Sequence, residues 1–426
     1  MRIASLPISV ADATAIARDG YVFGYPLVLM DRRRRGAPVN RFTHARALPG
    51  AGGASTSPDT GLLRSAAWLD LGPQPVVLTV PDTYGRCFAL ALVDGWGDVF
   101  ASVGSRTTGS RGGAYAICSP AWRGDLPDAL TVIRAPTRTV WIVGGIQVDR
   151  DTAYSAAHAV QAGFALRAPG APGARDGSAA AAASGLARPA DEVAALPPAA
   201  FFGRLAALLR DNPPRLQDRV VVDRMRSLGL LAEDGHGLER LEPELRDAVA
   251  RGVVQGRGVV RAAAAAAPGE RVGAWWMPSA GGRDYLGRAA AACAGLEPGA
   301  LEDALTAVAA ADAQGRELDG RHRYRLRFPG GSPVVHGFWT LATHEGRRPL
   351  AGEPSEPFAV CDWNGLALDD DGALTIAIGH GPRRGGPSLN RLAAPPGRFT
   401  LLLSLHWPAS DVFERRWTLP PVCRIG

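Results

Sequence analysis

The sequence predicts a mainly β protein of the α+β class, in which a small helical unit separates two β domains. Short runs rich in β-branched and aromatic residues recur in the first and last thirds of the chain, separated by Pro and Gly turns. The middle of the chain instead repeats apolar residues at helical spacing. The 426 residues also exceed the roughly 250–300 over which one hydrophobic core keeps growing, so we expect several domains.

The first predicted element is an entry helix within residues 1–35. Its apolar residues Ala13, Ile16, Ala17 and Tyr21 follow helical spacing. Proline lacks the backbone N–H of a helix interior, so Pro26 should end or kink this helix. The arginine run at residues 32–35 then reads as solvated surface.

Residues 36–167 predict an immunoglobulin-like β-sandwich. Four runs have strand character and are separated by turn residues with no helical pattern between them. They are Val76–Val80, Arg86–Val93, Tyr115–Cys118 and Thr139–Gly144.

Three further segments complete the predicted organisation. Residues 168–190 are low in complexity and read as a flexible linker, and residues 191–272 form a helical unit. Residues 273–426 should begin with a helix pair at Tyr285–Cys293 and Leu301–Ala311 and continue as a jelly-roll-like β-sandwich. Its strands are expected at Tyr324–Phe328, Pro333–Thr343, Leu374–Ile378 and Phe399–Trp407.

All 47 basic residues are arginine, because the chain contains no lysine. Without a lysine amine there is no Schiff base to pyridoxal phosphate and no phosphate-gripping lysine of a P-loop, so both cofactor classes are excluded. No other cofactor is predicted, since neither a G-x-G-x-x-G nor an H-E-x-x-H motif occurs.

The net charge of +6 is scattered along the chain, so we expect no nucleic-acid partner. No apolar run reaches the roughly 18–20 residues of a membrane span, and the N-terminus lacks the pattern of a secretion signal. The five cysteines never form a C-x-x-C pair, which is typical of buried thiols. The expected location is cytoplasmic.

An ordered series of short strings resembles the bacterial family that joins domain of unknown function 1254 to domain of unknown function 1214. In the first half the strings are GYPLVLMD at 24–31, NRFTH at 40–44, AWLDL at 67–71, VPDT at 80–83, RTTG at 106–109 and VWI at 140–142. In the second half they are LDG at 318–320, YRLRFPGG at 324–331, FWTL at 338–341 and WTLP at 417–420. The resemblance implies an immunoglobulin-like sandwich, a helical segment and a second β-sandwich.

The chain departs from the family pattern at two places. The family's Asn-x-Asp-Thr-Leu-Tyr-Ser segment, aligned without gaps on Trp68, places Asp59 at the Asn position and Arg64 at the Tyr position. In the second half, an expected Asn-Trp-Leu-Pro begins at Asn390 and continues with different residues, and an expected Arg-x-Tyr becomes Ser404-x-His406. If these positions form the family's site, the site is remodelled here.

The candidate ligand-binding residues are Asn40, His44, Arg106 and Asp59. An amide, a group that titrates near neutrality and a bidentate anion binder could together hold and protonate a carboxylate or hydroxylated ligand. The structural alternative is that Arg106 ties down a Gly-rich turn while His44 caps a loop.

Two other sets of polar residues have simpler explanations. Asp82 and Asp94 sit in turns, where an Asp side chain bonds its own backbone. His336, His380 and His406 are weak metal-ligand candidates, because the usual H-x-H and carboxylate spacing is missing. No metal site is therefore predicted.

Two functional hypotheses follow from the sequence. The first is small-molecule binding or enzymatic turnover in a cleft bounded by the N-terminal sandwich. The second is a non-catalytic interaction or assembly protein. Clustering of Asn40, His44 and Arg106 would favour the first, and their separation would favour the second.

Overall fold

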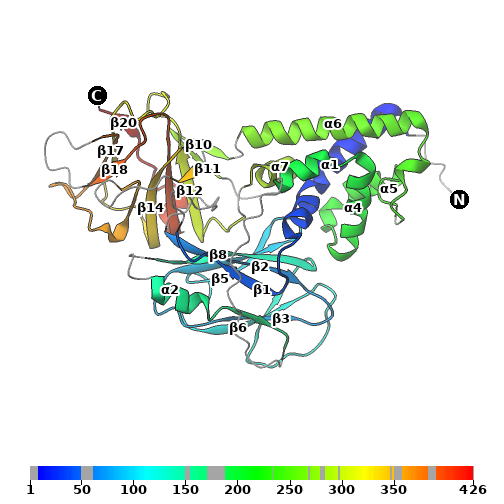
Figure 1. Ribbon diagram of the computed structural model, residues 1–426, viewed down its shortest axis with the longest axis horizontal. Coiled ribbons are helices and arrows are strands. Elements are labelled where there is room, and N and C mark those ends of the chain that lie inside the picture. The colour runs from blue at the N-terminus through cyan, green and yellow to red at the C-terminus, as the bar shows by residue number, and fades with distance from the viewer. Residues whose placement is uncertain are drawn as a thin grey trace.

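The computed structural model arranges the chain in three units, each with its own hydrophobic core (Figure 1). It describes residues 8–48, 61–148, 154–169, 188–232, 234–266, 269–278, 284–295, 298–345, 348–349, 357–381 and 390–425. The fold is a mixed α+β arrangement with mostly antiparallel sheets, as the sequence predicts at that level.

The N-terminal β unit contains two sheets that share one core. The larger has the strand order β1 (Arg41–His44), β2 (Leu62–Asp70), β8 (Thr139–Gln147), β4 (Phe88–Asp94), β5 (Val99–Gly104). The smaller has the order β7 (Thr131–Arg134), β6 (Gly113–Cys118), β3 (Val76–Val80), β9 (Ala165–Arg167). Leu69 and Leu90 of the larger sheet meet Leu78 and Ile117 of the smaller, all fully buried. Helix α2 (Tyr154–Gln161) adds Ala157 and Val160 to this core.

The helical unit is built around α1 (Val10–Arg34). The Ser9 side chain caps this helix by accepting from the Asp12 N–H, and every residue from Gly20 to Met30 is buried. The surrounding helices are α3 (Pro189–Ala195), α4 (Pro198–Asp211), α5 (Arg219–Ser227), α6 (Pro243–Ala265) and α7 (Tyr285–Ala294), with short 3₁₀ turns at Leu216–Asp218 and Leu238–Arg240. The helix continues through Pro26 to Arg34, so of the two predicted effects of this proline, ending or kinking the helix, the first does not occur.

Glycines on α6 allow it to lie directly against α1. A Cβ atom added to Gly252 would approach the Thr14 carbonyl oxygen to 2.4 Å, and one added to Gly256 would approach the Tyr21 ring to 3.0 Å. Larger side chains here would push the two helices apart. In the part of the chain that the structure describes, no single helix has the length and apolar character to cross a membrane, although α3 and α4 pass that test together with a 118° bend between them.

The sequence suggested that the arginine run ending α1 is solvated surface, but only Arg35 is exposed, and Arg32, Arg33 and Arg34 are partly buried. Arg32 pairs with Glu192 of α3, Arg33 donates to the Ala292 carbonyl oxygen of α7, and Arg34 pairs with Asp70 of β2. Successive helix positions point in directions about 100° apart, so neighbouring arginines reach different parts of the protein. The run joins the entry helix to two other helices and to the N-terminal β unit.

The C-terminal β unit also contains two sheets around one core. One has the order β10 (Glu270–Val272), β11 (Trp275–Met277), β12 (Ala304–Ala309), β19 (Thr400–Pro408), β14 (Val335–Glu345), β15 (Arg348–Pro349), and β16 (Ala359–Cys361) pairs with β14. The other has the order β18 (Arg391–Ala393), β17 (Leu374–Gly379), β13 (Tyr324–Phe328), β20 (Val422–Arg424). Trp339 and Leu403 of the first sheet meet Leu326 and Ile376 of the second, all fully buried. A 3₁₀ turn (Asp362–Asn364) and α8 (Ser410–Phe413) connect strands.

The helix predicted at Leu301–Ala311 is instead strand β12. Alanine-rich sequence favours a helix, but β12 pairs with β11 on one side and β19 on the other. Alternate residues Leu305, Ala307 and Ala309 are buried, which is the period of a strand. Tertiary pairing therefore overrides the local propensity.

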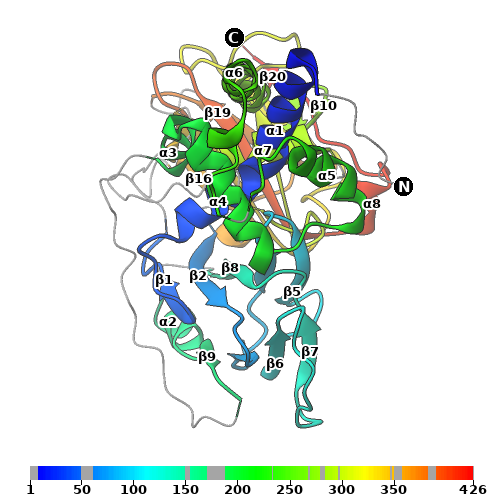
Figure 2. The same cartoon turned by 90° about the vertical axis from the view of Figure 1, so that its right-hand side faces the viewer.

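The two β units are in contact at two glycines and at an ion pair. A Cβ atom on Gly61 would lie 2.6 Å from the Phe338 ring, and one on Gly337 would lie 3.0 Å from Cys87 Sγ. Arg106 Nε lies 2.6 Å from Asp303 Oδ1. Figure 2 shows the helical unit above the N-terminal β unit in the perpendicular view.

Candidate functional site

Asn40 precedes β1 and holds the local backbone. Its φ of +56° is a left-handed conformation that asparagine tolerates better than most residues. Its Oδ1 accepts from the Asp70 N–H at 3.0 Å, and it lines a hollow of about 420 Å³ beside Asp70. This asparagine is exposed, but its amide oxygen is already used in the turn.

His44 ends β1 and points into the N-terminal core. It is 3% exposed, its ring stacks on Phe42, and its Nδ1 lies 2.9 Å from Ser65 Oγ. Ser65 Oγ accepts a hydrogen bond from Gln161 Nε2 at 3.2 Å. The Ser65 hydroxyl can therefore donate its own hydrogen to His44 Nδ1. Burial, and then the charge of Arg46, lower the pKa of His44 to about 4. The ring is therefore neutral at physiological pH and belongs to the core.

Arg106 follows β5, whereas Asn40 and His44 flank β1. These strands are the two edges of a five-stranded sheet. Four inter-strand spacings of about 4.8 Å separate them by about 19 Å. Since Arg106 pairs with Asp303 of the C-terminal β unit, the structure does not bring these three residues into one site. Asp59, the fourth candidate, lies outside the described residues.

The three candidate histidines have different surroundings. His336 is exposed beside the Trp407 ring. His380 Nδ1 lies 3.2 Å from the Ala394 carbonyl oxygen. His406 is buried, and its ring stacks on that of Phe338 with 4.1 Å between the ring centroids. Within the described ranges, no group of three His, Cys, Asp or Glu side chains is arranged to hold a metal ion.

Asp82 and Asp94 make the turn contacts that the sequence suggests. Asp82 Oδ1 accepts from the Tyr84 N–H at 2.7 Å, and Asp94 Oδ1 accepts from the Trp96 and Asp98 N–H groups. Burial raises the pKa of Asp94 to about 6, against the lowering effect of these bonds. Both carboxylates therefore shape turns.

Asn390 occupies the first position of the family's Asn-Trp-Leu-Pro string. Its side chain joins neighbouring backbone segments. Its side chain is bonded to the Ala367 backbone by both amide atoms, and its Nδ2 also donates to the Thr375 carbonyl oxygen. Ser404 stands where the family's Arg-x-Tyr string has arginine. Its Oγ lies 3.0 Å from Thr306 Oγ1, across the pairing of β12 with β19.

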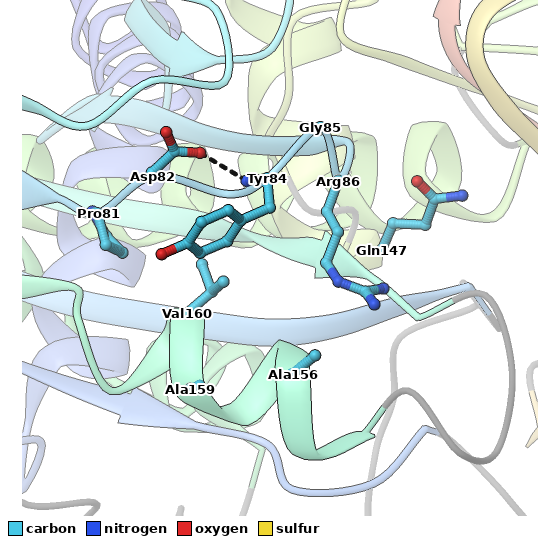
Figure 3. Close-up of a pocket in the computed structure, with 9 residues that line it drawn as sticks. All are labelled: Pro81, Asp82, Tyr84, Gly85, Arg86, Gln147, Ala156, Ala159 and Val160. Atoms are coloured by element: carbon cyan, nitrogen blue, oxygen red, sulfur yellow. Dashed lines mark hydrogen bonds between the residues drawn. The ribbon is translucent and has the colours of Figure 1, made fainter.

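A different part of the N-terminal β unit forms a second hollow. It measures about 620 Å³ and lies between the loop that follows β3 and the helix α2 (Figure 3). The described lining residues are Pro81, Asp82, Tyr84, Gly85, Arg86, Gln147, Ala156, Ala159 and Val160. Figure 3 shows the Tyr84 ring above Val160, with the Arg86 side chain directed toward α2.

The loop holds Tyr84 in a strained and exposed position. Tyr84 and Gly85 both have positive φ, +52° and +80°, and the Arg86 N–H donates to the Thr83 carbonyl oxygen at 3.1 Å. This combination is typical of a type I′ turn, which prefers Asn or Asp followed by Gly. Buried Thr83 fixes the turn through bonds to Arg86 and Ser110, yet the Tyr84 side chain is 86% exposed.

Sequence reasoning recognised this turn but missed Tyr84. The available signal was Gly85, since a glycine in a turn often marks a positive φ. Nothing in the sequence reveals that the preceding tyrosine shares that conformation or faces α2.

Comparisons with known proteins agree with this architecture. Residues 39–168 match the model of the protein of unknown function family DUF1254, and residues 303–410 match DUF1214, in that order along the chain. The chain belongs to the family that joins these two domains. The DUF1254 match covers the N-terminal β unit with the Tyr84 hollow, and the DUF1214 match covers most of the C-terminal β unit.

One solved structure supports the fold of this DUF1254–DUF1214 protein over nearly its whole length. The crystal structure of the VPA0106 protein from Vibrio parahaemolyticus aligns with a TM-score of 0.71 at 20% identity, covering 97% of this chain and 100% of that one. An uncharacterized protein from Burkholderia cenocepacia aligns with a TM-score of 0.45 at 12% identity, covering 98% and 95%. The chain has no significant match among curated proteins.

Proposed function

We propose that the protein binds a small molecule in the hollow between the Pro81–Arg86 loop and α2. The ligand class is a ring-containing molecule with an anionic group. The exposed face of Tyr84 suits stacking on a ring, and the Arg86 guanidinium suits a carboxylate or phosphate. The volume of about 620 Å³ falls within the range of known small-molecule sites.

The conformation of Tyr84 carries this proposal. A left-handed backbone costs a non-glycine residue about 1 kcal/mol or more. An aromatic ring that is 86% exposed recovers almost none of that cost by burial. Strain without a folding benefit points to a role outside folding, and the ring stands over a hollow with charged and amide groups.

We propose binding as the activity of this hollow, because the carboxylate of its described lining, Asp82, accepts the Tyr84 N–H and shapes the turn. We also propose that the N-terminal β unit is an immunoglobulin-like sandwich that bounds the cleft, and that the C-terminal β unit is a jelly-roll-like sandwich. The core shared by the two sheets of each unit supports this assignment.

The test compares wild type with Tyr84→Asn in thermal unfolding against benzoate, 4-hydroxybenzoate, phenyl phosphate and inorganic phosphate. Asparagine adopts positive φ more readily than tyrosine, so the variant should be about 0.5–1 kcal/mol more stable without ligand. A ring compound should raise the melting temperature of wild type and leave that of Tyr84→Asn unchanged.

Phe413→Ser, which removes another partly exposed ring far along the chain, is the matched control and should keep the ligand response. A lower stability of Tyr84→Asn would show that the ring supports the fold. That result, or an unchanged response to every ring compound in the variant, would overturn the proposal.

A further inference from the structure

Arginine occupies every second position from residue 321 to 327. Tyr324 and Leu326, which alternate with these arginines, and Phe328, which follows them, are at most 1% exposed and belong to the C-terminal core. Because side chains alternate across a strand, Arg325 and Arg327 of β13 point to the opposite, outer face of the sheet. The stem of Arg323 lies over Gly379 of β17, where an added Cβ would be 3.4 Å from Arg323 Cγ.

The register places a fourth arginine on the same surface. Arg325 pairs with Ala377 of β17, and Ala377 pairs with Arg391 of β18. Cross-strand partners share a face, so Arg325 and Arg391 flank Ala377. We call Arg323, Arg325, Arg327 and Arg391 the arginine face.

The described strands contribute no carboxylate to this surface. Their other residues on the outer face are Thr375, Ala377, Gly379, Ala393 and Cys423. Arg327 is paired from a loop, with Asp371 and with Asp369 at 3.8 Å. Arg323 and Arg325 are exposed, and neither has an ion-pair partner among the residues that the structure describes.

The arginine face lies on the sheet farther from the rest of the protein. Figure 1 shows β17, β18 and β20 at the end of the molecule away from the helical unit, with β12 and β14 between. A partner could therefore approach without disturbing the other units.

We propose that the arginine face binds an acidic segment of a partner polypeptide in an extended conformation. Alternate residues of an extended chain recur about every 6.6 Å, which is also the spacing of arginines at alternate positions of β13. Carboxylates at every second position of the partner would therefore match Arg323 and Arg325 one to one.

The protein itself illustrates the contact. In the turn before β13, Arg321 takes the Asp319 carboxylate with both ends of its guanidinium, at 3.0 Å from Nε and 2.8 Å from Nη2. Arginine is the side chain best suited to this bidentate geometry. The central arginines offer the same chemistry to a carboxylate from outside.

A protein partner fits the surface better than single-stranded nucleic acid. Nucleic-acid strands bind by stacking bases on exposed aromatic rings as well as by phosphate contacts. Tyr324 and Phe328, the aromatic residues of β13, both face the core. On this face the described strands offer charge at regular spacing and no aromatic ring for a base.

The experiment measures the fluorescence anisotropy of a labelled twelve-residue peptide in which Glu and Ser alternate, titrated with the full chain. Wild type should bind, and Arg323→Glu with Arg325→Glu should weaken binding by about tenfold or more, since two attractive contacts become repulsive. Arg188→Glu with Arg226→Glu on the helical unit makes the same change in net charge and should retain wild-type binding.

Three results would overturn the proposal. These are no binding by wild type, equal loss in the two double variants, or equal binding of a peptide with the same glutamates in one block. An oligodeoxythymidine or an anionic phospholipid vesicle that binds more tightly than the alternating peptide, and depends on Arg323 and Arg325, would assign the surface to that partner instead. Tyr84→Asn should leave peptide binding intact, which separates this inference from the proposed small-molecule site.

Discussion

The two arginine-rich segments of the protein use the same side chain for opposite purposes. At the end of α1, four consecutive arginines diverge and contact Glu192, the Ala292 carbonyl oxygen, Asp70 and Asp31. At β13, Arg323 just before the strand and Arg325 and Arg327 within it lie on one face, and Arg323 and Arg325 are exposed. A helix distributes neighbouring charges over many partners, whereas a strand collects alternate charges on one surface.

The same contrast separates the histidines. His44 is enclosed with Ser65 and Gln161 between two sheets, while His336 and His380 are exposed. Enclosed polar groups should therefore govern stability, and exposed ones should be available for binding. The predictions that follow test this division, beginning with the largest effect.

Acid should destabilise the protein through His44. Its pKa is about 4 in the folded protein against 6.5 in the unfolded chain, so the unfolded chain takes up the proton first as pH falls. The stability contributed by neutral His44 is complete above pH 6.5 and declines between pH 6.5 and 4. The total loss is about 3 kcal/mol, at about 1.4 kcal/mol per pH unit.

Urea unfolding of wild type and His44→Gln across this pH window measures the effect. The variant should show a smaller slope of unfolding free energy against pH. Identical slopes in the two proteins would mean that other groups cause the acid sensitivity.

Replacing an aspartate that pairs with arginine should lower the free energy of unfolding more at the end of α1 than at the arginine face. Asp70 contacts both Arg34 and Arg138 and is 29% exposed, whereas Asp371 beside Arg327 is 61% exposed. We expect Asp70→Asn to lower the unfolding free energy by about 1–2 kcal/mol and Asp371→Asn to lower it less, because solvent screens the exposed Asp371. Chemical denaturation of both variants at neutral pH gives the comparison, and equal losses would contradict it.

The effect of Asp70→Asn on the free energy of unfolding should also depend on pH, because the Asp70 carboxylate can be protonated. Burial raises the pKa of Asp70, but the hydrogen bond from Arg138 and the charges of Arg34 and Arg138 outweigh it, so the pKa is lowered overall. The stability from this carboxylate is therefore present above about pH 4 and disappears as pH falls through its lower folded value. The difference between wild type and Asp70→Asn should shrink below pH 4.

The smallest change in the free energy of unfolding is expected when a glutamate is introduced into the arginine face. Ala377→Glu places an acid between Arg325 and Arg391 and should raise the unfolding free energy by about 0.5 kcal/mol at low salt. The same variant should lose the alternating acidic peptide, while Ala377→Gln keeps it. Peptide binding by Ala377→Glu equal to that of Ala377→Gln would place the contact elsewhere.

Much of the secondary structure could be predicted because the apolar period matches the final elements. Val76–Val80 and Tyr324–Phe328 are strands with the bounds expected from the sequence. The prediction failed where long-range contacts outweighed a local signal. The alanine-rich Leu301–Ala311 segment, predicted as a helix, contains strand β12.

The candidate site was less predictable than the fold. Asn40, His44 and Arg106 belong to family-like strings, but the order of strands within a sheet does not follow the order in sequence. Opposite sheet edges and a contact to the C-terminal β unit separate them. Tyr84 was missed because neither its φ nor its exposure is encoded in a local pattern.

The sequence by itself determined the family, the α+β class, the absence of lysine chemistry and the alternation that makes β13 basic on one side. These are properties of composition or of periods two and 3.6, which a strand or a helix expresses locally. Only the tertiary structure decided which polar groups are enclosed and which are exposed. Burial and pairing depend on residues far apart in the chain, and those contacts determine whether an arginine or a histidine stabilises the fold or faces a partner.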